Sequence, residues 1–210
     1  TKLYMKNIII IGCGQIGSRH LQGLVGIDFE SNIFVIDPNN HSLQLAKKRS
    51  KTLNLNENIK SINFSTGLEK INKKIDLAII ATNSNIRFKV INDILNRVDI
   101  KYFLLEKIVF QTREEFETII SNFNNLKIKS WVNCPRRVYP LSVLIKNQMS
   151  KNSKLFMKFE GSNWNLCSNS IHIIDLFSFL TQKNHFLYNF TKLNRKIYDS
   201  KRPGFFELDG

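Results

Sequence analysis

The chain has 210 residues, 42% of them hydrophobic, and a formal net charge of +14 with an isoelectric point near 9.8. This composition is typical of a globular protein of one or two domains. No apolar run approaches the roughly 20 residues that a membrane span needs, and the first residues lack a signal-peptide core, which argues against secretion. Cys13, Cys134 and Cys167 lie far apart without a CxxC pair, which argues against a disulfide framework or metal site and favours a reducing cytoplasm.

A glycine-rich turn follows the first apolar run, residues 8–11, and precedes a segment with helical periodicity. A strand, a tight glycine turn and a helix in this order are what a dinucleotide-binding fingerprint requires. Gly12 allows the sharp turn, Gly14 leaves room for a pyrophosphate, and Gly17 lets the helix pack closely. We expect the cofactor to contact Gly12, Gly14, Gln15, Ile16 and Gly17.

The second predicted strand, residues 33–36, ends in Asp37. An acid roughly 20 residues beyond the glycine turn is where a ribose-binding carboxylate belongs, and its charge repels a 2′-phosphate. Asp37 therefore favours NAD as the cofactor, with NADP as the alternative. A glycine turn in an unrelated α/β protein is the competing interpretation, and the position of Asp37 makes it the weaker one.

Helical and strand patterns alternate through the rest of the first 133 residues. We predict helices over residues 42–49, 86–95 and 112–123, and strands over residues 62–64, 76–81, 102–105 and 126–132. This alternation predicts a parallel, doubly wound sheet whose loops gather at one carboxyl edge. Residues 1–133 are thus predicted to form a Rossmann dinucleotide-binding domain.

The pattern changes after Asn133. Residues 134–140 carry two prolines and two arginines, which suits a crossing between domains. Beyond it we predict helices over residues 141–149 and 170–180, strands over residues 154–160, 186–191 and 195–198, and a strand followed by a turn over residues 205–210. Residues 134–210 are therefore predicted to begin an α+β domain.

Several motifs together resemble the glucose–fructose oxidoreductase / inositol dehydrogenase / MocA (Gfo/Idh/MocA) family. They are GCGQIGSRHLQGL, the strand end at Asp37, the loop ATNS after Ile80, the tripeptide LEK at residues 105–107, and HIIDL at residues 172–176. The resemblance implies an NAD(P)-dependent oxidoreductase that oxidises a sugar hydroxyl or reduces a ketone. It also implies a longer chain whose second domain is α+β with an open, mostly antiparallel sheet. Part of that sheet is then missing here, by truncation or as a naturally short form, and homo-oligomers would form through it.

The resemblance implies that Lys107 contacts the reacting hydroxyl and that Glu106 lies near the nicotinamide ribose. The family's Glu-Lys-Pro is here Glu106-Lys107-Ile108. Independently, a hydride leaves a carbinol carbon only as the hydroxyl proton is removed or polarised, and a desolvated lysine with a lowered pKa could do this. The alternative for Lys107 is a surface lysine at a strand end.

The family's second catalytic element, Asp-x-Gly-x-His-x-x-Asp, corresponds to residues 168–175, SNSIHIID. His172 and Asp175 are retained, whereas Ser168 replaces the acid, so Ser168 or Asn169 would hold the substrate instead. His172 could relay the substrate proton; a core histidine satisfied by a neighbour is the alternative.

Further site residues follow from the same resemblance. Thr82 and Ser84 are expected to reach the cofactor, and Arg87, which replaces a family histidine, is expected to be solvated. Asn133, Arg136 and Tyr139 would line the substrate cleft, where a guanidinium suits a carboxylate or phosphate. Ion pairing between domains is the structural alternative for Arg136 and Arg137.

The sequence thus predicts a cytoplasmic NAD-dependent oxidoreductase acting on a sugar or nucleotide sugar, in surface-glycan precursor synthesis, with Lys107 and His172 managing the proton and no metal. A non-catalytic dinucleotide-binding or sensor protein of the same fold is the alternative. The basic residues occur in scattered short pairs rather than in a long arm. We therefore expect an attraction of anionic substrates and no nucleic-acid binding.

Overall fold

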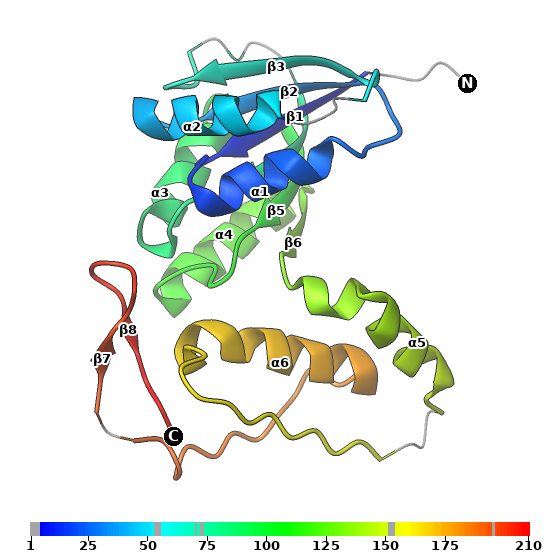
Figure 1. Cartoon of the computed structure of the whole chain (residues 1–210), viewed down its shortest axis with the longest axis vertical. Helices are drawn as coiled ribbons and strands as arrows, with labels where there is room; N and C mark the ends of the chain where they lie inside the picture. Colours follow the sequence, from blue (N-terminus) through cyan, green and yellow to red (C-terminus); the bar gives the residue numbers. More distant parts are fainter. Residues whose placement is uncertain (1–4, 53–55, 70, 72–73, 151–153, 195) are drawn as a thin grey trace. The chain divides into compact units, whose positions relative to one another are not determined.

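The chain divides into two compact units, residues 1–133 and 134–210. Figure 1 shows the computed structural model, which describes residues 5–52, 56–69, 71, 74–150, 154–194 and 196–210. None of the helices among the described residues combines the length and the apolarity needed to cross a membrane.

The first unit is built on a parallel sheet of six strands in the order β3-β2-β1-β4-β5-β6. The strands are β1 (Lys6–Ile11), β2 (Ser31–Ile36), β3 (Ile59–Ser65), β4 (Ile75–Ile80), β5 (Ile100–Leu105) and β6 (Lys129–Val132). The predicted doubly wound sheet is confirmed. The strand order reverses between β1 and β4, and ligands bind at such a switch point in open α/β sheets.

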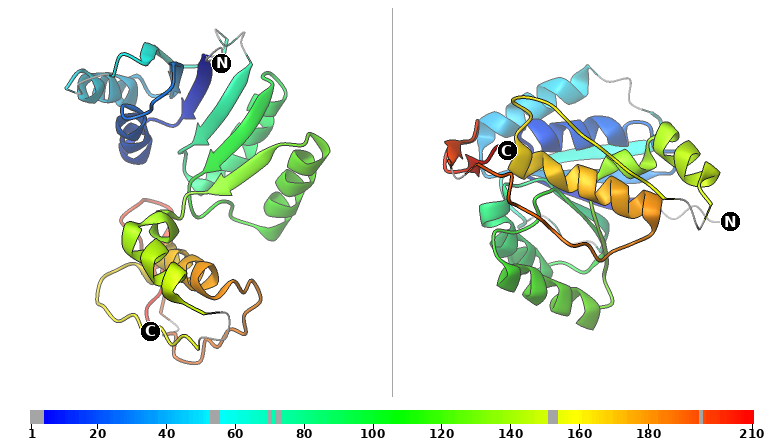
Figure 2. Two further views of the ribbon diagram at one scale, coloured as in Figure 1. Left: turned by 90° about the vertical axis from the view of Figure 1, so that its right-hand side faces the viewer. Right: turned by 90° about the horizontal axis from the view of Figure 1, so that it is seen from below.

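Helices cover both faces of this sheet (Figure 2, left). They are α1 (Gln15–Leu24), α2 (Asn40–Lys51), α3 (Ser84–Leu95) and α4 (Arg113–Asn125). Alternation along β1 separates two cores: Ile8 and Ile10 pack with Leu21 of α1 and Leu43 of α2. Ile9 and Ile11 belong to the other core, with Ile91 and Ile94 of α3 and Ile119 and Phe123 of α4. Because both faces of β1 are buried, its sequence is a continuous apolar run rather than an alternation of apolar and polar residues.

Two features of this unit refine the prediction. Thr112 and Glu115 form a capping box at the start of α4, where the side chain of each residue bonds the backbone N–H of the other. The third strand is longer than expected because β3 extends through the polar residues Lys60 and Ser61. Ile59 and Ser61 pair with Ser31 and Asn32 of β2, and Lys60 lies at the irregularity in register between them. Pairing rather than apolarity thus keeps a polar edge segment extended.

The second unit contains η1 (Pro135–Val138), α5 (Pro140–Gln148), α6 (Leu166–Thr181) and an antiparallel pair, β7 (Tyr198–Asp199) and β8 (Phe206–Glu207). α6 begins at Leu166 rather than at the predicted residue 170. The predicted strands over residues 154–160 and 186–191 are wrong, since the described residues there form no strand. Of the predicted strand 195–198, Arg195 lies outside the described residues. Alternation marks a surface that could pair, but a strand forms only against a partner.

Candidate cofactor and catalytic site

The glycine turn after β1 admits no side chain at two of its positions. Gly12 has φ +86°, and a Cβ there would lie 2.9 Å from the backbone nitrogen of Thr82. A Cβ on Gly17 would lie 1.8 Å from the carbonyl oxygen of Gly12, closer than any real contact. Both glycines are therefore required by the turn itself, before any ligand is considered.

The start of α1 is open to a ligand. A Cβ on Gly14 would meet nothing within 4 Å, and both Gln15 and Ile16 are exposed. Gly14 is the N-cap, and no side chain among the described residues caps the first N–H groups of the helix. Free N–H groups and the positive end of the helix dipole at a bare glycine turn fit the pyrophosphate of a dinucleotide.

Asp37 is held against the glycine turn by two backbone donors. The N–H of Cys13 donates to one carboxylate oxygen at 2.7 Å, and the N–H of Asn39 donates to the other at 2.9 Å. Each oxygen keeps a lone pair for a ribose hydroxyl. Burial, together with the neighbouring Asp37 charge, raises the pKa of the Cys13 thiol to about 12, so this cysteine stays protonated and is no nucleophile.

Glu106 gathers side chains from three elements at the carboxyl edge of the sheet. His20 of α1 places its Nε2 2.7 Å from the Glu106 carboxylate, and the Asn133 amide after β6 donates to the same oxygen at 2.6 Å. Burial alone would raise the pKa of Glu106, but these two hydrogen bonds and the charge of Arg87 outweigh it and hold the pKa below its usual value. Glu106 is therefore ionised at neutral pH.

Arg87 corrects an expectation, because it is not solvated. It lies in the first turns of α3 with only 2% of its surface exposed, and it donates to the carbonyls of Glu106, Ile108, Val109 and Thr82. The neighbouring Ile86 is 48% exposed, whereas Ile91 and Ile94 further along α3 are fully buried. Arg87 is therefore buried against loop carbonyls that the helical pattern does not reveal.

Three further predicted residues lie at the same carboxyl edge. Thr82 is half-buried in the loop after β4. Ser84 is buried at the first position of α3, where its hydroxyl accepts a 2.5 Å hydrogen bond from the Gln111 amide. Lys107 is half-buried in the loop after β5 and precedes a cis peptide bond to Ile108. The first unit thus brings together the glycine turn, Asp37, Thr82, Ser84, Glu106, Lys107 and Asn133.

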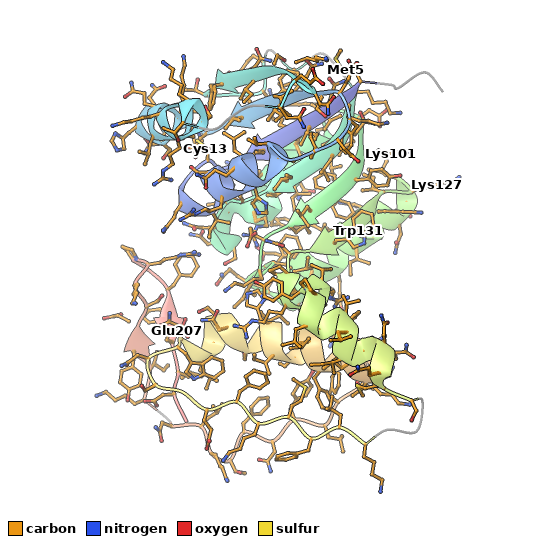
Figure 3. The ribbon with its side chains drawn as sticks, turned by 45° about the vertical axis from the view of Figure 1, so that its right-hand side comes forward. Met5, Cys13, Lys101, Lys127, Trp131 and Glu207 are labelled. Carbon is orange, nitrogen blue, oxygen red and sulfur yellow. The ribbon has the colours of Figure 1, made fainter. Side chains whose placement is uncertain are left out.

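Arg136, Tyr139, Ser168, Asn169 and His172 lie in the second unit. Ser168 donates to the carboxylate of Glu207 at 2.6 Å, and the Asn169 amide donates to the Trp164 carbonyl. Figure 3 shows Glu207 on β8 beside the start of α6. Ser168 and Asn169 therefore organise the beginning of this helix, and any contact with a substrate stays a prediction.

The remaining residues of this group have different environments. His172 is half-buried one turn beyond Ser168 on α6. Asp175 forms a two-point ion pair with Arg137: the guanidinium Nε lies 2.9 Å from Oδ2, and Nη2 donates to Oδ1. Arg136 is half-buried in η1, whereas Tyr139 is 53% exposed. Arg137, one of the two candidates for an ion pair between domains, is thus paired within its own unit.

Sequence reasoning missed His20, Arg87, Gln111 and Glu207. His20 stands three residues after Gly17, on the same helical face, and this spacing could have drawn attention to it. Arg87, Gln111 and Glu207 carry no such signal, because their partners lie 5 to 40 residues away in the sequence. Their roles emerge only from the fold.

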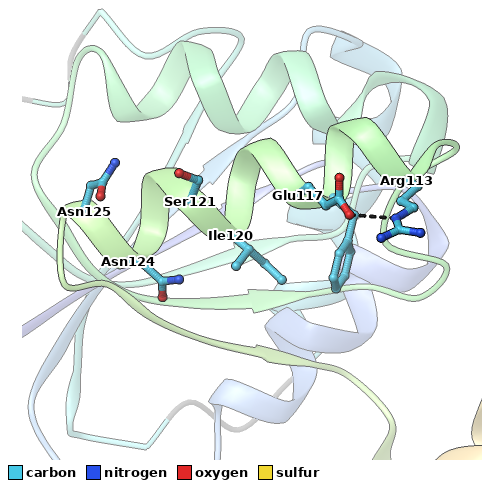
Figure 4. A pocket seen from close by; sticks show the side chains of 7 residues that line it. Arg113, Glu117, Ile120, Ser121, Asn124 and Asn125 are labelled. Carbon is cyan, nitrogen blue, oxygen red and sulfur yellow. Dashed lines mark hydrogen bonds and ion pairs between the residues drawn. The ribbon is translucent and has the colours of Figure 1, made fainter.

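Two hollows lie away from the predicted residues. One, of about 540 Å³, is lined by one face of α4 from Arg113 to Asn125, including the Arg113–Glu117 ion pair (Figure 4). The other, of about 430 Å³, lies on the sheet and is lined by residues that include Tyr102 and Trp131. Neither is lined by a residue of the glycine turn or by Lys107.

The comparisons with known proteins agree with this geometry. Residues 6–133 match a family model described as an oxidoreductase family with an NAD-binding Rossmann fold. No curated protein sequence matches the chain.

Solved structures share the fold at low sequence identity. They include scyllo-inositol dehydrogenase from Lactobacillus casei with NAD(H) and scyllo-inositol (16% identity, TM-score 0.63, 85% of this chain and 57% of that one). The WlbA (WbpB) dehydrogenase from Thermus thermophilus with NAD and UDP-GlcNAcA is 17% identical (TM-score 0.60, 84% and 62%). An oxidoreductase from Agrobacterium radiobacter with NAD+, L-tartaric acid and magnesium is 15% identical (TM-score 0.61, 83% and 54%). The chain therefore spans little more than half the length of such proteins.

Proposed function

The chain belongs to the Gfo/Idh/MocA oxidoreductase family, and from this premise we propose that it transfers a hydride between NAD and a carbon of a sugar or nucleotide sugar. Its first unit is an NAD-binding Rossmann domain by family and by fold. The hydride donor or acceptor is the nicotinamide, which supplies the redox chemistry when the cofactor is bound. The substrate would carry a hydroxyl in one direction and a ketone in the other.

One observation carries the proposal: the Asp37 carboxylate is held 2.7 Å from the backbone nitrogen of Cys13, inside the glycine turn. This contact joins the two parts of a dinucleotide-binding site: the free N–H groups that would bind the phosphates and the carboxylate that would bind a ribose. Gly14 leaves the approach to those N–H groups open. The residues present therefore fit NAD, and the negative charge of Asp37 disfavours NADP.

A side chain of the protein must accept or donate the hydroxyl proton in this reaction. Lys107 stands in the loop after β5, where strand ends gather, and would accept the hydroxyl proton as the hydride leaves. The adjacent carboxylate of Glu106, ionised and held by His20 and Asn133, would orient the nicotinamide ribose. His172 would relay the proton from the second unit, with Ser168, Asn169, Arg136 and Tyr139 contacting the substrate.

The substrate class is supported by two arguments. Structures of the same fold hold scyllo-inositol and UDP-GlcNAcA. The net charge of +14 would attract an anionic substrate such as a nucleotide sugar. We therefore propose a role in the synthesis of surface-glycan precursors. The cytoplasmic location and the homo-oligomer formed through the second unit are further parts of the proposal, and the oligomer rests on the family resemblance alone.

The proposal is tested by thermal unfolding of the chain with NAD, NADH, NADP and NADPH in parallel. A cofactor at 100 times its Kd adds about 2.7 kcal/mol to the free energy of unfolding. We expect NAD and NADH to raise the unfolding temperature more than their phosphorylated forms. No shift with any of the four contradicts NAD binding, and a larger shift with NADP contradicts the role of Asp37.

A non-catalytic dinucleotide-binding or sensor protein is the second candidate. It is favoured by Ser168, which stands in place of an acid and is engaged by Glu207 at 2.6 Å. The two candidates differ in turnover: UDP-GlcNAcA and scyllo-inositol should be oxidised, with a rise in NADH absorbance, only by the enzyme. NAD binding without turnover of such hydroxyl compounds favours the sensor.

A further inference from the structure

A single buried cation joins the two loops on which the proposed chemistry depends. Arg87 donates from one guanidinium nitrogen to the carbonyls of Glu106 at 2.5 Å, Ile108 at 2.5 Å and Val109 at 2.8 Å. Its other terminal nitrogen donates to the carbonyl of Thr82. The acceptors belong to the loop after β5 and the loop after β4, so one side chain spans both.

The acceptors flank Lys107 on both sides. Glu106 precedes this lysine and Ile108 follows it, and both of their carbonyls point to the same guanidinium nitrogen. The direction in which a backbone segment projects its side chain is set by the orientation of the adjoining peptide groups. The Glu106 carbonyl belongs to the peptide group that adjoins Lys107, and the Ile108 carbonyl belongs to the peptide group one residue beyond it. Holding both carbonyls therefore restrains the backbone on either side of Lys107, and with it the direction of the Lys107 side chain.

A second link strengthens the same connection. The Gln111 amide donates to the hydroxyl of Ser84 at 2.5 Å, and Ser84 is the first residue of α3, the helix that carries Arg87. The segment from Glu106 to Gln111 is thus fastened to the start of α3 at both of its ends. Thr82 and Ser84 are the residues of that region proposed to reach the cofactor.

Stability alone does not account for a cation at this position. Arg87 is 2% exposed, and removing a guanidinium from water costs several kcal/mol that its hydrogen bonds must offset. Replacing such a group with a well-packed apolar side chain of similar volume is often neutral or stabilising. What an apolar side chain cannot do is hold four carbonyl groups from two loops in one fixed arrangement.

We propose that Arg87 is a positioning residue that ties the loop after β4 to the loop after β5, and so holds Thr82 at the NAD site and Lys107 at the reacting carbon in register with each other. The proposal rests on the proposed function. It assigns to Arg87 no contact with NAD or with the substrate. Arg87 acts through the backbone of the residues that make those contacts.

The experiment compares the full chain with the variants Arg87→Met, Arg87→Lys and Arg87→Ala, and with Arg113→Met as a matched control. Arg113 is 89% exposed and pairs only with Glu117 of its own helix among the contacts described for it. The first measurement, without cofactor, is amide hydrogen exchange of residues 82–84 and 106–111 relative to β1 and β2. The second is the Kd for NADH, measured by fluorescence.

We expect Arg87→Met to accelerate amide exchange in both loops by about tenfold or more, while β1 and β2 keep their protection. Tenfold corresponds to the loss of one hydrogen bond to a charged group. NADH should bind about tenfold more weakly for the same reason. Arg87→Lys should give intermediate values, because an ammonium cannot reach all four carbonyls. Millimolar guanidinium added to Arg87→Ala should restore part of the NADH affinity, which a general loss of stability would not allow.

Several outcomes overturn the proposal: unchanged exchange in both loops, equal loss of protection in β1 and β2, or an unchanged NADH Kd with no effect of guanidinium. If Arg87→Met does not fold, Arg87→Lys provides the test. An NADH affinity and an exchange pattern in Arg87→Lys equal to those of the unaltered chain would contradict the proposal that Arg87 joins the two loops. If the unaltered chain does not bind NADH, the proposed function fails and the cofactor half of this proposal falls with it. The exchange measurement then still decides whether Arg87 joins the loops.

Discussion

The hydroxyl of Ser168 donates a 2.6 Å hydrogen bond to the carboxylate of Glu207, which lies 39 residues later in the chain. The other oxygen of that carboxylate accepts the backbone N–H of Cys167 at 2.8 Å. A carboxylate from β8 thereby satisfies donors in the first turn of α6, where the helix dipole favours negative charge. The short antiparallel pair is anchored to the main helix of the second unit by this one side chain.

Glu207→Ala should lower the free energy of unfolding of the second unit by about 1–3 kcal/mol, since two half-buried donors lose their acceptor. Urea unfolding followed by circular dichroism and by tryptophan fluorescence measures the change. Glu160→Ala is the control, because Glu160 is exposed and forms an ion pair with the exposed amine of Lys158. Equal stability of the Glu207 and Glu160 variants would show that the anchor contributes nothing.

Glu106 makes the stability of the first unit depend on pH in the acid range. Its pKa in the folded chain is lower than the ordinary value of 4.5, so its contribution is complete above that value and is lost as the pH falls through the lower folded pKa. Glu106→Gln should therefore remove part of the stability seen at neutral pH and flatten its decline below about pH 4.5. Urea unfolding at a series of pH values checks this, with the exposed Glu117→Gln as control. A decline of equal slope in the Glu106 variant is the contrary result.

Asp37→Asn should weaken NADH binding by about tenfold or more, because a charged acceptor for the ribose hydroxyls is lost. NADPH binding should stay equal or improve, since the repulsion of the 2′-phosphate is removed. Fluorescence titration with both cofactors gives the ratio of the two Kd values. If that ratio does not move toward NADPH, Asp37 does not set the cofactor preference.

Lys107→Met should lower turnover of a responsive sugar substrate by about 100-fold or more, the usual effect of losing a general acid or base. The NADH Kd should stay within about twofold, because this lysine is proposed to meet the substrate rather than the cofactor. Lys101→Met is the control: this exposed lysine of β5 lies 4.8 Å from the Tyr102 ring, on the same strand that leads to Lys107. Turnover that survives in the Lys107 variant would falsify the catalytic assignment.

Local patterns along the chain were sufficient for the architecture of the first unit. The glycine turn, the four consecutive isoleucines before it and Asp37 are close in sequence, and each constrains its own neighbourhood through sterics or burial. Gly17 is an example: the need for a bare position is set by a carbonyl only five residues away. The NAD-binding Rossmann fold was therefore predictable and is confirmed.

The tertiary structure decided which distant groups meet. His20 reaches Glu106 across 86 residues, Arg87 turns inward to the carbonyls 19 to 22 residues ahead, and the predicted strand at residues 154–160 finds no partner among the described residues. Hydrophobic periodicity records which side of an element avoids water, but it does not record the direction of a buried cation or the presence of a pairing strand. Those depend on the packing of elements remote in sequence, and for that reason the fold class was readable from the chain while the contacts around Glu106 and Arg87 were not.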